Sequence, residues 1–213
     1  MSAIMKVVAQ TMFWVSTVLA VLVALVSYRF IPLGVELAME FLAHNLKDNS
    51  FALYAHIAVA PIALALMPFQ FMKRLRARKP SLHRWTGRIY VAAVFISGAA
   101  GLQLAFHSMA GGLAVSGFAL LAVAWLGTTM AALWFALRRD ILRHQAWMVR
   151  SAALTFAAVT LRIYLPLSMV SGFEFEIAYP IISWACWVPN LIAAELFLLF
   201  KRQPRTAVFQ TTG

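Results

Sequence analysis

The sequence predicts an all-α integral membrane protein, a single bundle of six transmembrane helices. Of the 213 residues, 63% are hydrophobic and 12% are charged, whereas a soluble domain has roughly 45–50% apolar and about 25% charged residues. The chain also contains several charge-free runs of the roughly 20 residues that a helix needs to cross a bilayer. Basic residues collect in alternate connections between these runs, as they do in multi-pass membrane proteins.

The hydrophobic runs define the spans in chain order. The first run, 7–28, is charge-free and longer than the apolar core of a signal peptide, so we expect a permanent helix. The apolar stretch 89–137 divides into two spans at Gly111-Gly112, because a glycine pair favours a turn. The predicted spans are 7–28, 49–72, 89–109, 113–137, 147–170 and 177–200.

The segments outside the spans are short. Residues 32–46 begin with a proline suited to a first helical turn and are predicted to form a short amphipathic helix. No soluble domain or internal repeat is evident, so residues 1–203 are expected to form one membrane domain and 204–213 a cytoplasmic tail.

The basic residues test the number of spans independently. Fifteen of the eighteen Lys and Arg fall on one side of the predicted membrane, together with both chain ends. Cytoplasmic loops carry this excess, so both termini are predicted to be cytoplasmic. The net charge of +11 is then explained by anionic lipid headgroups at that face, and nucleic acid is not an expected partner. The lone cysteine, Cys186, excludes an internal disulfide and a thiolate metal site.

Ionisable side chains within the spans are the candidate functional residues, because each costs roughly 2.5–3.5 kcal/mol at mid-helix. Helical rise places His56 and His107 near the outer surface, and His83 and His144 near the inner surface. Facing imidazoles in a helix bundle can bind haem iron axially. These residues therefore suggest haem b bound by one or both pairs, with its propionates held by arginines: Arg84, Arg88, Arg150 and Arg162.

Haem would make the protein an electron carrier across the membrane or to a quinone or another redox partner. The alternative for the histidines is structural. His83 and His144 can be interfacial residues in basic loops, and His56 a hydrogen-bonded residue of the bundle.

Arg162 and Glu195 differ in predicted depth by about 10 Å or more, so they are not expected to pair. Glu195 is expected to pair at the inner boundary with one of five residues: His83, Arg84, Arg88, His144 or Arg150. The candidate partners of Arg162 are His56, Gln103, the carbonyls before Pro166, or an anionic ligand.

Two further functions stay open. The chain can be a carrier or channel for a small anionic solute, with Arg162 as the binding charge and Glu195 as a proton-coupling group. It can also be a non-catalytic accessory subunit in which polar residues only fix the packing. No HExxH sequence, nucleophile elbow or phosphate-binding glycine loop occurs, so no enzymatic reaction is assigned.

Two basic segments lead into spans three and five. In SLHRWTGRIY, His83, Gly87 and Tyr90 share one face if the segment is helical. In RRDILRHQAWMVRS, the shared face holds His144, Trp147, Met148 and Ser151.

The segment LHRWTGRIY, with HIAVAPIALALMPFQF before it and HQAWMVRSAALTFAAVTLRIYLP after it, resembles a bacterial family of small membrane proteins catalogued as a domain of unknown function. The resemblance covers about Ala55 to Pro166 and implies a multi-helix bacterial membrane protein. We expect it in the bacterial cytoplasmic (inner) membrane. The matching residues are His56, Gln70, His83, Arg84, Gly87, Arg88, Tyr90, His144, Trp147, Arg150 and Arg162. His107 has no counterpart in the family's pattern. Since the family brings no activity, the resemblance supports only the choice of polar residues, Gln70 included.

Overall fold

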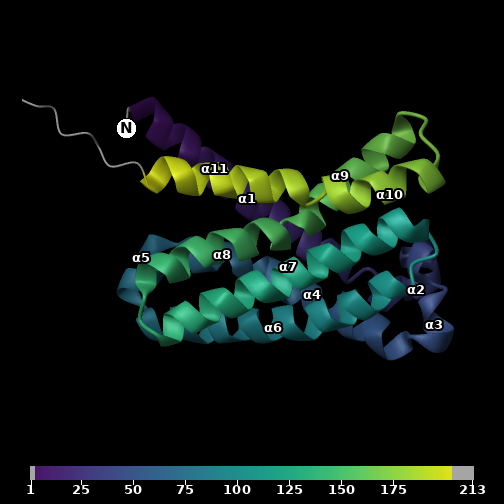
Figure 1. Ribbon diagram of the computed structural model, residues 1–213, viewed down its shortest axis with the longest axis horizontal. Helices are drawn as coiled ribbons and strands as arrows, with labels where there is room; N and C mark the ends of the chain where they lie inside the picture. The colour runs from purple at the N-terminus through teal and green to yellow at the C-terminus, as the bar shows by residue number, and fades with distance from the viewer. Residues whose placement is uncertain (1–2, 203–213) are drawn as a thin grey trace, which may run out of the picture.

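A computed structural model describes residues 3–202, which are almost entirely helical and contain no strand (Figure 1). The elements in chain order are α1 (Ala3–Ser27), α2 (Phe30–Ala38), the 3-10 helix η1 (Glu40–Leu42), α3 (Asn45–Asp48), α4 (Ser50–Phe71), α5 (Lys73–Arg78), α6 (Pro80–Phe106), α7 (Gly111–Leu137), α8 (Ile141–Thr155), α9 (Ala157–Val170), α10 (Phe175–Ala185) and α11 (Val188–Arg202).

The prediction of six spans is confirmed for the described residues. α1, α4, α6 and α7 each form one apolar helix of membrane-spanning length, and α8 with α9 and α10 with α11 form the other two. The helices of spans three and five begin earlier than 89 and 147, because helical structure continues into the basic segments. Pro80 occupies the first turn of α6, and the Asp140 side chain caps α8 by accepting the Arg143 N–H at 3.1 Å.

The segment 32–46 differs from the predicted single helix. It is divided among α2, η1 and α3. Gly34 has φ +75°, a conformation that glycine adopts at low cost and that interrupts regular helix. The predicted tail, 204–213, lies outside the described residues.

The chain connections define two ends of the bundle. α5 and the turn between α7 and α8 lie at what we call the basic end, on the left in Figure 1. α2, η1, α3, the turn 107–110 and the loop 171–174 lie at the opposite end, which we call the distal end.

α4, α6, α7 and α8 lie side by side and form the compact part of the bundle (Figure 1). Small residues allow close approach, as is usual between membrane helices. A Cβ added to Gly98 of α6 would lie 2.8 Å from a methyl carbon of Leu126 in α7. On the lipid-facing side many large apolar side chains are exposed, among them Val18, Val123 and Leu196.

Spans five and six are each interrupted near their midpoint. Span six is interrupted between α10 and α11, where Pro189 has no N–H to continue the helical hydrogen bonding. Span five is interrupted at Phe156. There the Asn190 amide of span six donates to Ala153 O at 3.3 Å and to Thr160 Oγ1 at 2.8 Å, on either side of the interruption. Figure 1 shows α9 rising away from the direction of α7, while α8 runs beside it.

Candidate functional site

A cavity of about 1070 Å³ lies in the distal half of the bundle. It is bordered by α1, α4, α6, α7 and α9, and the segment 39–45 lies at its distal end. The divergence of α9 from α7 leaves this space beside the compact part of the bundle. Most of the wall is apolar, formed by residues such as Val26, Ile57, Leu64, Phe118, Leu121 and Leu161.

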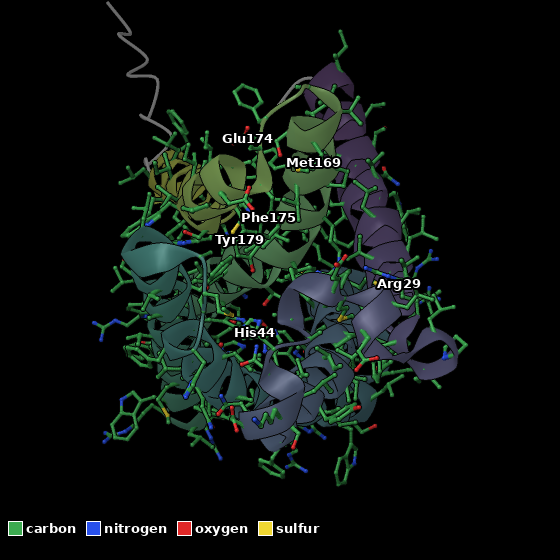
Figure 2. The ribbon with its side chains drawn as sticks, turned by 90° about the vertical axis from the view of Figure 1, so that its right-hand side faces the viewer. Arg29, His44, Met169, Glu174, Phe175 and Tyr179 are labelled. Carbon is green, nitrogen blue, oxygen red and sulfur yellow. The ribbon has the colours of Figure 1, made fainter. Side chains whose placement is uncertain are left out.

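Aromatic side chains pack across the distal end of the cavity. The Phe41 ring of η1 contacts Phe175 and Tyr179 of α10, with centroid distances of 6.4 and 5.8 Å. Tyr179 also contacts Phe118 of α7 at 5.3 Å. Figure 2 looks onto this end, with Phe175 and Tyr179 on the side of α10 and His44 and Arg29 on the side of α2 and α3.

The Arg29 guanidinium is hydrogen-bonded within the distal end of the bundle, at α2. Its Nε and Nη2 atoms donate to Ala38 O at 3.1 and 2.7 Å. This double hydrogen bond joins the two ends of α2. Arg29 nevertheless lines the cavity, as do Glu40 and His44.

His56 of α4 lines the cavity with its ring orientation fixed. Its Nδ1 lies 2.8 Å from Ser97 O, and since a carbonyl only accepts, Nδ1 carries the proton and donates. The second ring nitrogen, Nε2, is then an acceptor or a metal ligand. A Cβ added to Gly101 would lie 2.9 Å from His56 Nδ1, so glycine at this position makes room for the ring.

Arg162 of α9 lines the same cavity. Its Nη1 donates to Ala158 O of its own helix at 3.0 Å, whereas a guanidinium has five N–H donors. Among residues 3–202 the ion pairs are Arg143–Asp140 and Arg150–Glu195. Arg162 therefore has no carboxylate partner in the described part of the chain, and Gln103, one predicted partner, bonds to Asn49 instead.

The predicted outer histidine pair is not assembled on the cavity wall. His107 is exposed at the end of α6, and its Nδ1 donates to Gln103 O at 2.9 Å. Its backbone carbonyl accepts the His44 Nε2 proton at 3.0 Å. His56 lines the cavity and His107 does not.

The inner histidines lie in the same part of the basic end. His144 Nδ1 donates to Ala132 O of α7 at 2.9 Å. His83 Nδ1 is buried and has no hydrogen-bond partner among the described residues. The two histidines are near enough to interact electrostatically, and the charges of Arg76 and Arg84 also act on His83.

Glu195 pairs at the basic boundary as expected. Arg150 donates to it through Nε at 2.5 Å and Nη2 at 2.8 Å, and the guanidinium also lies over the Trp147 ring at 4.6 Å. Arg88 lies over Trp85 at 5.1 Å, and both it and Arg84 are exposed. Arg150 is therefore committed to Glu195 and Trp147.

Gln70 joins α4 to the start of α6. Its Nε2 donates to Thr86 Oγ1 at 3.0 Å, and its side chain is buried. A Cβ added to Gly87 would lie 3.1 Å from Gln70 Oε1. These contacts give Gln70 a packing role at the basic end, away from the cavity.

Residues 3–202 contain no group of three or more His, Cys, Asp or Glu side chains arranged to hold a metal ion. Two axial histidines on a haem iron are fewer than three side chains. This finding therefore concerns only metal sites whose ligands all come from the protein. Sequence reasoning missed Arg29 and Tyr179 as cavity residues. Both lie at predicted span ends, where polar and aromatic residues are common in membrane proteins. Their sequence positions therefore did not distinguish them from ordinary residues of the membrane interface.

Six apolar helices and a cavity among them define a multi-pass membrane protein. The chain belongs to the family described as "Predicted membrane protein (DUF2306)", whose match covers residues 53–198. This confirms the resemblance drawn from the segments around His56, His83 and His144. α1 and α2 precede the matched region. Comparison with curated proteins and with solved structures gives no match.

Proposed function

We propose that this protein binds a large amphipathic molecule with an acidic group in the distal cavity, and that Arg162 binds the acid. One observation carries the proposal: a guanidinium without a carboxylate partner among the described residues lines a mostly apolar cavity of about 1070 Å³. Binding cavities for small molecules are usually apolar, about 300–1,000 Å³ in volume, with a few polar groups that orient the ligand.

The apolar wall narrows the class of ligand. A small inorganic anion would leave most of the cavity unfilled. A ligand with a hydrocarbon body would fill it, and burial of its apolar surface would contribute a favourable free energy of about 25 cal/mol per Å². A carboxylate or phosphate oxygen can accept from Arg162 in a bidentate arrangement. His56 Nε2, on the same wall, can accept a hydrogen bond from the ligand.

The test is binding of a fluorescent long-chain fatty acid to the purified protein in nanodiscs. Loss of a charge-assisted hydrogen bond, worth about 1.5–3 kcal/mol, should weaken binding by about 10- to 100-fold in Arg162→Gln. Arg88→Gln is the matched control, because Arg88 is an exposed arginine outside the cavity. The methyl ester of the same probe should bind wild type and Arg162→Gln equally.

A fatty acid that binds wild type and Arg162→Gln with the same affinity would show that Arg162 does not bind the acid. If the wild-type protein shows no saturable binding of the fatty acid, the proposal that the cavity binds an amphipathic acid is contradicted.

Haem b is a second candidate, because it is itself a planar apolar molecule with acidic propionates. The specific observation in its favour is the ring orientation of His56 and His144. Each donates Nδ1–H to a carbonyl of another helix, the arrangement that usually orients a metal-binding imidazole. His56 Nε2 would then hold iron in the cavity and Arg162 a propionate, while His83 and His144 offer a second position at the basic end. Bound haem would supply one-electron chemistry, with a quinone or redox protein as the partner.

A reduced-minus-oxidised visible spectrum with a haem assay tests this candidate directly. Stoichiometric haem should be lost, wholly or at one of two sites, in His56→Ala and in His144→Ala. His107→Ala is the control, since His107 is exposed and outside the cavity, and it should keep the full signal. A colourless, folded wild-type protein would exclude haem and leave the amphipathic acid as the occupant.

A further inference from the structure

Two arginines from neighbouring segments line the distal cavity. Arg162 lies on α9, and Arg29 lies just after the end of α1. α1 and α9 contact each other, and both border the cavity. The two arginine side chains are partly buried, and the charge of Arg29 acts electrostatically on Arg162. The cavity wall therefore holds two positive charges that interact with each other.

Both guanidinium groups keep hydrogen-bond donors for a ligand. Arg29 uses Nε and Nη2 to donate to Ala38 O, while its Nη1 bonds to no residue among 3–202. Arg162 uses Nη1 to donate to Ala158 O, which leaves the donors on Nε and Nη2. Neither arginine forms an ion pair with a carboxylate of the described residues. Because peptide carbonyls carry no net charge, these hydrogen bonds compensate neither positive charge.

The carboxylates that line the cavity do not replace the missing counter-charges. Glu40 and Glu176 border its distal end, but both side chains are exposed. The charge of an exposed carboxylate is solvated by water and screened by salt over roughly 8 Å at physiological ionic strength. The partly buried part of the wall, with Arg29 and Arg162, therefore stays positive.

Two positive charges favour an acidic group that carries more than one negative charge. A carboxylate or a phosphate diester carries one, and would compensate only one arginine. A phosphate monoester carries about −1.5 to −2 at pH 7 and has three strong acceptor oxygens. Arginine binds such oxygens through pairs of N–H donors, and three oxygens are enough to accept from two guanidinium groups.

We propose that the acidic group of the cavity ligand is a phosphate monoester, bound by Arg162 and Arg29 together, and that Arg29 sets the preference for it. This inference rests on the proposed function, because it concerns the same cavity and the same ligand. The ligand class is then a long-chain phosphate monoester, such as an alkyl phosphate or phosphatidic acid. A fatty acid binds more weakly, since Arg162 alone compensates its single charge.

The experiment is displacement of the fluorescent fatty acid from the full-length protein in nanodiscs of zwitterionic lipid. Three competitors share one hydrocarbon chain: an alkyl phosphate, its methyl diester, and the unlabelled fatty acid. In wild type, the alkyl phosphate should displace the probe at about 10-fold lower concentration than the other two, because it gains charge-assisted hydrogen bonds from Arg29. Inorganic phosphate, the fourth competitor, should not displace the probe at these concentrations.

Arg29→Gln should abolish the preference for the alkyl phosphate over its methyl diester and change the affinity for the fatty acid little. Lys47→Gln is the matched control, because Lys47 is an exposed basic residue of α3 at the same end and outside the cavity. This variant should keep the preference. Thermal unfolding identifies loss of structure in Arg29→Gln, and the wild-type ratio between monoester and diester decides the proposal without any variant.

Equal displacement of the probe by the alkyl phosphate and its methyl diester in wild type would overturn this inference, as would an unchanged preference in folded Arg29→Gln. In both cases the binding of an acid by Arg162 would stand. Displacement by inorganic phosphate at the same concentration as the alkyl phosphate would assign the site to free phosphate and overturn the lipid class. If the fluorescent fatty acid and the alkyl phosphate both fail to bind wild type, the proposed function itself is contradicted.

Discussion

At the scale of single residues, charge and depth together decide what each polar side chain does. Glu195 and Arg150 lie close to the basic boundary and satisfy each other in a bidentate pair. Arg162 lies deeper and forms no ion pair with a carboxylate of the described residues. A buried charge needs compensation, and the acidic ligand that we propose for the adjoining cavity would supply it.

Gly101 allows a residue-scale prediction about the cavity wall. Gly101→Ala would place a methyl group 2.9 Å from His56 Nδ1 and should displace the ring and weaken its bond to Ser97 O. We expect weaker binding of the cavity ligand. Gly127→Ala is the control, because nothing lies within 4 Å of its added Cβ. Replacing this mid-helix glycine should leave binding intact and stabilise the fold by up to about 1 kcal/mol.

Ligand titration and thermal unfolding of the two variants check this prediction together. Equal ligand affinity in Gly101→Ala and Gly127→Ala would mean that the position of the His56 ring does not affect binding.

At the scale of elements, the interruptions of spans five and six shape the cavity. α9 diverges from α7 after Phe156, and the space beside it is the distal cavity (Figure 1). Asn190 holds this geometry, because its amide donates to Ala153 O, Thr160 Oγ1 and Cys186 O, at 3.3, 2.8 and 3.0 Å.

Asn190→Asp is the element-scale prediction. The substitution keeps the side-chain shape but replaces the donating amide with a carboxylate that faces two carbonyl acceptors, Ala153 O and Cys186 O. Unpaired buried polar groups cost about 1–3 kcal/mol, so we expect a lower unfolding temperature and a reduced ligand affinity. Gln103→Glu is a comparison at an exposed amide that donates to a single side chain, where the loss should be smaller. An unfolding temperature unchanged in Asn190→Asp would show that the interruption is stable without this amide.

At the scale of the whole molecule, the distribution of charge predicts the orientation in the membrane. Two connections, 72–79 and 138–143, bring eight arginines and lysines to the basic end: Lys73, Arg74, Arg76, Arg78, Lys79, Arg138, Arg139 and Arg143. From the positive-inside rule we expect this end to lie in the cytoplasm and the cavity to lie in the outer half of the bilayer.

Cysteine labelling in intact cells tests this orientation. With Cys186 replaced by alanine, Ser171→Cys at the distal end should react with a membrane-impermeant maleimide. Ala77→Cys in α5 should react only after the membrane is permeabilised. Both positions are exposed, so access across the membrane, rather than burial, decides the result. The reverse labelling pattern would contradict the predicted orientation.

The sequence by itself determined the six spans, the two ends of differing charge and the pairing of Glu195 at the basic boundary. These features depend on hydrophobic length, the placement of charges and helical rise, all of which are local or additive along the chain. It also identified His56 and Arg162 as residues that need a partner, from the cost of polar groups in hydrocarbon.

Only the tertiary structure decided which of these residues meet. Whether His56 faces His107 or a cavity depends on helix rotation and on the direction of α9, which Asn190 and the interruption at Phe156 set across two spans. The same holds for Tyr90, Ser151 and Thr129, whose hydroxyls come from three helices. Hydropathy carries no information on these rotations, because lipid and protein interior are similarly apolar and a span can turn any face inward.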